Sequence, residues 1–290
     1  MKNFTEAWAD SNARFEALLA ERYARHGEPQ EKLFAAMNYS LLAGGKRLRP
    51  FLVYQFCLAC GGRAEDADNA ALAIELIHTY SLIHDDLPAM DNDDYRRGRL
   101  TNHKVYGEAM AILAGDGLLT DAFLCLGSAP LPPDRIANAV RILSREAGPW
   151  GMVGGQVLDI LSEERELTER EVLDIQTRKT GGLIRAACAM GVVCGGGTSA
   201  QMEAARRYAD GIGLAFQIRD DVLDVIGDAK KLGKAVGVDA QKNTFVRLYG
   251  IEACQKRIDT ETSAACAALD VFQNKGILTQ IAYYLAKRDH

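Results

Sequence analysis

The sequence lacks the features that mark several common classes of protein. Its 290 residues contain no run of 18 consecutive apolar residues, so we expect no stable membrane span. The first residues are charged and amphipathic, without the apolar stretch of a signal peptide. A net charge of −5 argues against the basic surface of a nucleic-acid-binding protein. We therefore expect a cytoplasmic protein that binds no nucleic acid.

Residues that break helices are also scarce. There are 7 prolines, strand-like alternation is rare, and apolar residues recur every three or four positions, as over residues 72–83. These patterns predict an all-α fold. No long linker divides the chain, so we expect a single domain over residues 1–290. Of the 7 cysteines, Cys57 and Cys60 form a C-x-x-C with no second pair at zinc spacing. Buried reduced thiols are therefore expected.

Three carboxylates end one apolar stretch of the chain. The segment HDDLPAMD places Asp85, Asp86 and Asp91 after a helix-like run. Because unpaired carboxylates are costly to desolvate, they either face solvent at a helix end or bind something positive. A straight helix would separate Asp85 and Asp91 by about 120°. Pro88 should disrupt the helix after Asp86, which would let Asp91 swing back toward Asp85.

A second acidic motif, RDDVLDVIGD, begins at Arg219. Helical geometry gives this stretch one polar face, formed by Gln217, Asp220, Asp221 and Asp224. Clustered carboxylates raise one another's pKa, and a divalent cation removes that repulsion. Oxygen ligands favour Mg²⁺ over zinc. The two motifs together predict two acidic walls of one cavity.

Basic segments complete the pattern. Four of them carry glycine beside lysine or arginine: GGKRLRP, YRRGR, RKTGG and LGKAVG. Arginine forks and lysine suit phosphate recognition, and glycine lets backbone N–H groups approach an anion. Each segment alone is typical of a solvated surface. His78 shares a helix face with Asp85 and could add a donor. The combination predicts a site for two diphosphates, one activated by metal ions and one held directly by cations.

Taken together, these segments resemble the short-chain trans-isoprenyl diphosphate synthases, most closely the bacterial type of farnesyl diphosphate synthase. The matching segments follow the family order and cover nearly all of the chain: LLAGGKRLRP, ELIHTYSLIHDDLPAMDNDDYRRGRLTNH, GEAMAILAGDGLL, GGQVLDI, KTGGLIRAA, FQIRDDVLDVIGD and LGKAVGVD. The resemblance implies an isoprenoid synthase fold, with helices around a deep central cavity, usually as a homodimer. It also implies that an allylic diphosphate loses pyrophosphate and that the resulting cation alkylates isopentenyl diphosphate.

The resemblance also assigns roles to individual residues. Several Mg²⁺ ions, with Mn²⁺ as a substitute, would be bound by Asp85, Asp91 and Asp220, supported by Asp86, Asp221 and Asp224. The allylic substrate would contact Arg96, Lys179, Thr180, Gln217 and Lys234, of which Arg96 and Lys179 also belong to the catalytic set. Isopentenyl diphosphate would contact Gly45, Lys46, Arg49, His78 and Arg97. Gln156 and Asp159 would lie near the metal ions.

Product length depends on fewer residues. In the resembling family the position five before the first aspartate sets the floor of the cavity, and here it is Tyr80, followed by Ser81. We therefore predict a C15 product, farnesyl diphosphate, made from dimethylallyl and geranyl diphosphate. A geranylgeranyl diphosphate synthase, with a C20 product, is the alternative. A terpene cyclase would need no second anion site, and a non-catalytic subunit would be expected to lose one acidic motif, so both are remote.

Overall fold

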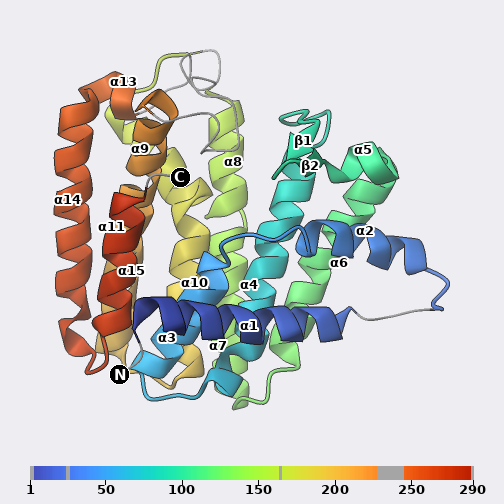
Figure 1. Cartoon of the computed structure of the whole chain (residues 1–290), viewed down its shortest axis with the longest axis horizontal. Helices are drawn as coiled ribbons and strands as arrows, with labels where there is room; N and C mark the ends of the chain where they lie inside the picture. Colours follow the sequence, from blue (N-terminus) through green and yellow to red (C-terminus); the bar gives the residue numbers. More distant parts are fainter. Residues whose placement is uncertain (1–2, 24–26, 163–164, 227–244, 289–290) are drawn as a thin grey trace.

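The computed structural model describes residues 3–23, 27–162, 165–226 and 245–288. Apart from one small hairpin, the elements in these ranges are helices (Figure 1). In chain order they are α1 (Phe4–Arg22), α2 (Glu31–Leu41), α3 (Leu48–Ala59), α4 (Ala64–Asp85), β1 (Tyr95–Arg96), β2 (Arg99–Leu100), α5 (Asn102–Tyr106), α6 (Glu108–Gly127), α7 (Pro133–Ala147), α8 (Met152–Ile160), α9 (Glu169–Lys179), α10 (Gly181–Cys194), α11 (Ser199–Ile226), α13 (Phe245–Tyr249), α14 (Ile251–Ala268), η1 (Leu269–Val271) and α15 (Gly276–Lys287). The all-α prediction is confirmed, and a single domain stays a prediction.

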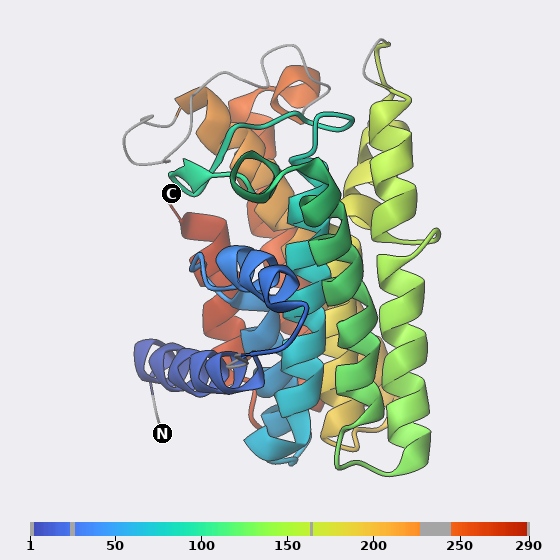
Figure 2. The same ribbon diagram turned by 90° about the vertical axis from the view of Figure 1, so that its right-hand side faces the viewer.

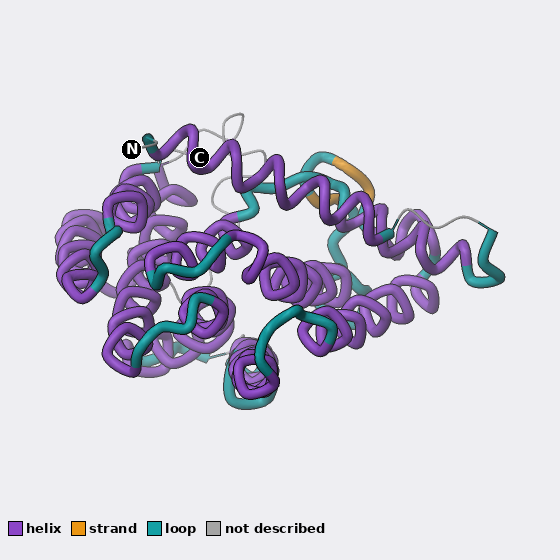
Figure 3. Tube along the Cα trace, turned by 90° about the horizontal axis from the view of Figure 1, so that it is seen from below, coloured by secondary structure: helices purple, strands orange, loops and turns teal. Residues whose placement is uncertain are grey.

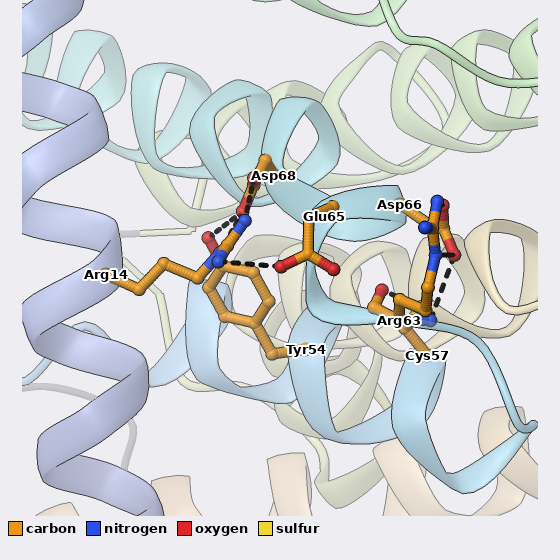
Figure 4. A network of polar contacts seen from close by, with 7 residues as sticks. All are labelled: Arg14, Tyr54, Cys57, Arg63, Glu65, Asp66 and Asp68. Carbon is orange, nitrogen blue, oxygen red and sulfur yellow. Dashed lines mark hydrogen bonds and ion pairs between the residues drawn. The ribbon is translucent and has the colours of Figure 1, made fainter.

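Helix α4 lies inside the bundle and carries the first acidic motif at its C-terminal end. It packs against α3, α6 and α10, and most of its apolar side chains are buried. Its start is fixed by a cap, in which the backbone N–H of Arg63 donates to the Asp66 carboxylate (2.9 Å; Figure 4). The helix ends at Asp85. Pro88 follows within three residues, where its ring and missing N–H prevent another helical turn.

Helix α1 lies across α3 and α4 and is tied to them by a polar network (Figures 1 and 4). The Arg14 guanidinium donates to both carboxylate oxygens of Asp68 (2.7 and 2.5 Å) and forms an ion pair with Glu65 (2.9 Å). The Tyr54 hydroxyl also donates to Asp68 (2.9 Å). Because a bidentate arginine–carboxylate pair has a specific geometry, it fixes where α1 crosses α4.

The C-terminal ends of α4 and α11 lie at the same end of the molecule. The β1–β2 hairpin that follows α4 and the helix α13 both lie at the top of Figures 1 and 2. Seen from below, many of the helices are viewed along their axes and pack side by side (Figure 3). A large cluster of buried apolar side chains runs from α1 to α15, and a smaller one joins α9, α11, α13 and α14. The two acidic motifs therefore share one end of a packed helical bundle.

Helix α6 is long and unusually apolar. An 18-residue window in it has a mean hydropathy of 1.6, and it is the one described helix that meets the length and composition criteria for a membrane span. It contains no unbroken apolar run of that length, because Asp116 and Asp121 interrupt it. One face of α6 packs along α4. On the outer face Ile112, Leu113 and Leu124 are exposed by 44%, 53% and 61%.

Candidate active site

The first acidic motif is shaped by the chain reversal after α4. The backbone N–H of Asp91 donates to the carbonyl oxygen of Asp85 (2.8 Å), which returns Asp91 to the end of the helix. The expectation that the chain turns back near Pro88 is therefore confirmed. Burial raises the pKa of Asp85 to about 6; Lys179 opposes this shift, and Asp91 adds to it. The end of α4 thus holds a half-buried carboxylate beside a second one.

Asp86 turns to a different partner. Asp86 is 3% exposed, and its carboxylate accepts a hydrogen bond from Nε of Arg96 (2.7 Å) and forms an ion pair with Nη2 (2.6 Å). Burial raises the pKa of Asp86, and the Arg96 guanidinium opposes the shift. This ion pair holds the β1–β2 hairpin against the end of α4. The sequence did not indicate this contact between Asp86 and Arg96. The predicted roles of Asp86 in supporting the metal ions and of Arg96 in contacting the allylic substrate stay predictions.

The hairpin turn brings a second arginine to the first basic segment. Arg97 and Gly98 have φ values of 53° and 72°, as a two-residue turn with left-handed backbone requires. The Arg97 guanidinium donates to the carbonyl oxygen of Gly44. A Cβ at residue 45 would lie 3.0 Å from Nη1 of Arg97, and Gly45 has a φ of 140°. Gly45 therefore leaves room for Arg97 in addition to its predicted substrate contact.

Arg49 and Arg97 form a cationic cluster with the uncharged ring of His78 beside them, where α3, α4 and the hairpin meet. The Nε atom of Arg49 is buried and has no hydrogen-bond partner within residues 3–23, 27–162, 165–226 and 245–288. Burial lowers the pKa of Arg49, and Arg97 lowers it further. The pKa of His78 lies well below its usual value because of burial and then the charges of Arg49 and Arg97. Positive groups held this close favour an anion. Lys46 is exposed in the loop just before α3.

The opposite wall comes from α8, α9 and α11. The Lys179 ammonium donates to the Asp159 carboxylate (2.5 Å), which joins α9 to α8. The Thr180 hydroxyl donates to Oε1 of Gln217 (3.3 Å) at the start of the second motif. Because the Lys179 charge also affects the pKa of Asp85, this wall faces the first motif. The structure thus brings Lys179, Thr180 and Gln217 together as predicted. Gln156 lies on α8, half-buried, three residues before Asp159.

The carboxylates of the second motif have separate surroundings. Asp221 is buried, accepts from Nε2 of Gln217 (3.1 Å) and from the backbone N–H of Phe245 (2.9 Å), and so fixes the start of α13. Asp224 is buried one turn further along α11. Asp220 is paired with Arg288 (2.5 Å). Lys234 lies outside the described residues.

Arg288 is a site residue that sequence reasoning missed. Its guanidinium stacks 3.8 Å from the centre of the Phe216 ring and donates to the Phe216 carbonyl as well as to Asp220. Nothing in the sequence around Arg288 indicates a site, because its partner Asp220 lies 68 residues earlier in the chain. Only the packing of α15 on α11 brings it there.

The predicted floor residues lie one turn below the first motif. The Tyr80 side chain is buried and meets the His84 ring edge-on, with 5.7 Å between ring centres. His84 in turn contacts the carbonyl oxygen of Ile112 on α6 (3.1 Å). A Cβ on Gly115 would collide with this imidazole. Tyr80 therefore lies beside the α4–α6 contact, and the Ser81 hydroxyl donates back to the carbonyl of His78 (2.9 Å).

The carboxylates suit magnesium with a bound substrate. Among the described residues no group of three histidine, cysteine or acidic side chains converges on one point. Mg²⁺ commonly takes one or two carboxylates and completes its shell with water and substrate phosphates. Asp85 beside Asp91, and Asp220 on the other wall, fit that pattern. Two of the largest grooves lie elsewhere, between α7, α10 and α11, and are lined by arginines including Arg141 and Arg206.

Comparison with known proteins identifies the family. The model of the polyprenyl synthetase family matches residues 30–279, which include both acidic motifs and all the basic segments. The chain belongs to this family.

Relatives with two kinds of product are similar to the chain. It is 46% identical over 262 residues to a farnesyl diphosphate synthase of Micrococcus luteus, covering 89% of this chain and 90% of that protein. It is 45% identical over 262 residues to a chloroplastic geranylgeranyl pyrophosphate synthase of Capsicum annuum, covering 88% and 71%. A crystal structure of an FPP/GFPP synthase from Zymomonas mobilis superposes with a TM-score of 0.85 at 35% identity, covering 98% and 97%. The chain is therefore a short-chain prenyltransferase with the all-α isoprenoid synthase fold.

Proposed function

We propose that the protein condenses isopentenyl diphosphate head-to-tail with dimethylallyl and then geranyl diphosphate, releasing pyrophosphate and giving (2E,6E)-farnesyl diphosphate. One observation carries the proposal. The Lys179 charge acts on the Asp85 carboxylate at the end of α4, while Arg49 and Arg97 form a separate basic cluster around His78, two turns earlier on the same helix. A site with one acidic and one basic part suits two diphosphates that are treated differently.

The chemistry follows from where negative charge develops. When the allylic C–O bond breaks, charge grows on the leaving pyrophosphate, and Lys179 can stabilise it more in the transition state than in the ground state. Mg²⁺ ions bound by Asp85, Asp91 and Asp220 would add Lewis-acid stabilisation of the same charge. Isopentenyl diphosphate keeps its diphosphate throughout, so Arg49, Arg97 and His78 need only bind and orient it.

Tyr80 supports the C15 product. Its buried ring lies one turn below Asp85 and would stop the growing chain. Relatives named for C15 and for C20 products are about equally identical to this chain, so a geranylgeranyl diphosphate synthase is the second candidate.

One incubation tests the proposal. The purified protein is mixed with isopentenyl and dimethylallyl diphosphate, with and without Mg²⁺, and the dephosphorylated products are separated by chromatography. We expect farnesol as the main product and none without the metal. Mostly geranylgeraniol would favour the second candidate, and no pyrophosphate release under any condition would overturn the whole proposal.

The proposal includes a homodimer formed through the outer face of α6. Exposed apolar residues on one helix face favour burial against a second protein surface. Light scattering should give a mass near twice 31.6 kDa. Leu113→Asp should shift it toward the monomer, whereas Leu58→Asp, on an exposed apolar residue of α3, should not.

A further inference from the structure

Arg47 is the basic residue of the GGKRLRP segment that does not face the candidate site. It is 3% exposed and has a φ of 50°, an uncommon backbone conformation for arginine. Its guanidinium donates to Glu16 on α1 (2.7 Å), to Glu75 on α4 (2.8 Å) and to the carbonyl oxygen of Leu41 at the end of α2 (2.7 Å). It also lies over the Phe15 ring at 5.5 Å. One side chain thus joins α1, α2 and α4 to the loop that carries Lys46 and leads into α3, where Arg49 lies.

Glu75 is the partner that matters for the site. It is 3% exposed, one turn before His78 on α4, so its charge needs a close cation. Among the described acids, Glu75 is the one whose charge raises the pKa of both Arg49 and Arg97. The charge of Glu75 therefore acts on both of these arginines as well as on Arg47. If Arg47 were absent, Glu75 would compete with an anionic substrate for them.

We propose that Arg47 is a positioning residue for the isopentenyl diphosphate site. It neutralises the Glu75 carboxylate, holds the loop over residues 44–47 in place before α3, and so leaves Arg49 and Arg97 available to the diphosphate. The inference rests on the proposed function and adds a residue to it. Arg47 touches no substrate in this scheme. Its guanidinium uses a different nitrogen for each of the three acceptors, in a fixed planar arrangement that the compact ammonium of lysine does not reproduce.

Steady-state kinetics with each substrate varied in turn test this role. Arg47→Met should raise KM for isopentenyl diphosphate on the order of tenfold. An unpaired Glu75 would attract Arg49 and Arg97, the two arginines that should bind this substrate. KM for geranyl diphosphate should stay within about twofold, because that substrate lies on the other wall. Glu75→Gln in the Arg47→Met background should recover most of the loss, since the competing charge is gone.

Arg14→Met is the matched control. Arg14 also ties α1 to α4 by ion pairs, but its partners Asp68 and Glu65 lie at the far end of α4 from the motif. It should lower the melting temperature without changing KM for isopentenyl diphosphate. An equal KM increase in Arg14→Met would show that Arg47 acts only through the fold. No recovery in the double variant, or an unchanged KM in Arg47→Met, would also overturn the proposal.

Two further measurements keep the outcomes separate. If Arg47→Met does not fold, Arg47→Gln replaces it, because glutamine can still donate a hydrogen bond but leaves Glu75 without a cation; a KM for isopentenyl diphosphate that stays at the wild-type value would then overturn the proposal. If the wild-type protein condenses no substrate, the proposed function is wrong. Calorimetry with inorganic pyrophosphate in the absence of metal would then still compare wild type with Arg47→Met, and equal affinities would overturn the role of Arg47.

Discussion

The backbone N–H of Asp91 is bonded to the carbonyl oxygen of Asp85 over 2.8 Å, so main-chain contacts set the shape of the first acidic motif. The side chains of both residues are then left to bind other groups. Substitutions at Asp85 should therefore change the chemistry of the site without unfolding it.

The first prediction follows directly. Asp85→Ala should lower turnover on the order of 10³-fold, about 4 kcal/mol of transition-state stabilisation. Its raised pKa means that the charged form of Asp85 lowers the stability of the folded state above about pH 6, so the melting temperature at pH 7.5 should not fall. Asp134→Ala, on an exposed acid of α7, is the control for turnover. Near-normal turnover in Asp85→Ala would rule out the proposed metal ligand.

Separate substrate sites give the second prediction. Arg49→Ala should raise the apparent KM for isopentenyl diphosphate roughly tenfold or more, because a charge-assisted contact is lost. Lys179→Ala should act mainly on the allylic substrate and on turnover. Initial rates with either substrate varied distinguish the two effects. Equal weakening of both substrates by both variants would contradict the division.

His78 should respond to ligand binding in a defined direction. Its pKa is well below the usual value, so the ring should stay neutral in the free protein at pH 6–8. A diphosphate placed beside the ring favours the protonated form and raises this pKa, so affinity for isopentenyl diphosphate should increase as the pH falls. NMR of the Cε1–H signal, assigned with His78→Gln, measures both states. A free-protein pKa near 6.5, unchanged by ligand, would contradict this.

Tyr80→Ala tests the product length. Removing the buried ring should open roughly one isoprene unit of space and shift products from C15 toward C20. Chromatography of the dephosphorylated products measures the shift. Ser81→Ala serves as the comparison, because it removes one hydroxyl that is already bonded to the backbone. Clean arrest at farnesol in Tyr80→Ala would place the floor elsewhere.

Sequence reasoning succeeded where the information was local. Helical spacing predicted α4 and α11, and Pro88 correctly indicated the reversal that returns Asp91 to Asp85. Glycine beside arginine led us to expect that backbone N–H groups approach an anion, which stays a prediction; what lies close to Gly45 is the guanidinium of Arg97.

Pairings between distant segments could not be read from the sequence. GGKRLRP shows three cations within four residues, but only the packing of α1, α2 and α4 turns Arg47 inward to Glu16 and Glu75. Similarly, helical spacing placed Asp220 and Asp221 on one face of α11. In the structure Asp220 pairs with Arg288, whereas Asp221 accepts from the backbone of Phe245. Such contacts depend on tertiary packing, which no local pattern encodes.

The missing side chain at Gly115 has a mechanical consequence. The imidazole of His84 fills the space that a Cβ at residue 115 would take, and it contacts the backbone of α6 at Ile112. Helix α6 therefore cannot slide or rotate along α4 without pushing the residue that precedes Asp85. A partner that displaced α6 from its outer surface would therefore also shift the residue next to the first carboxylate.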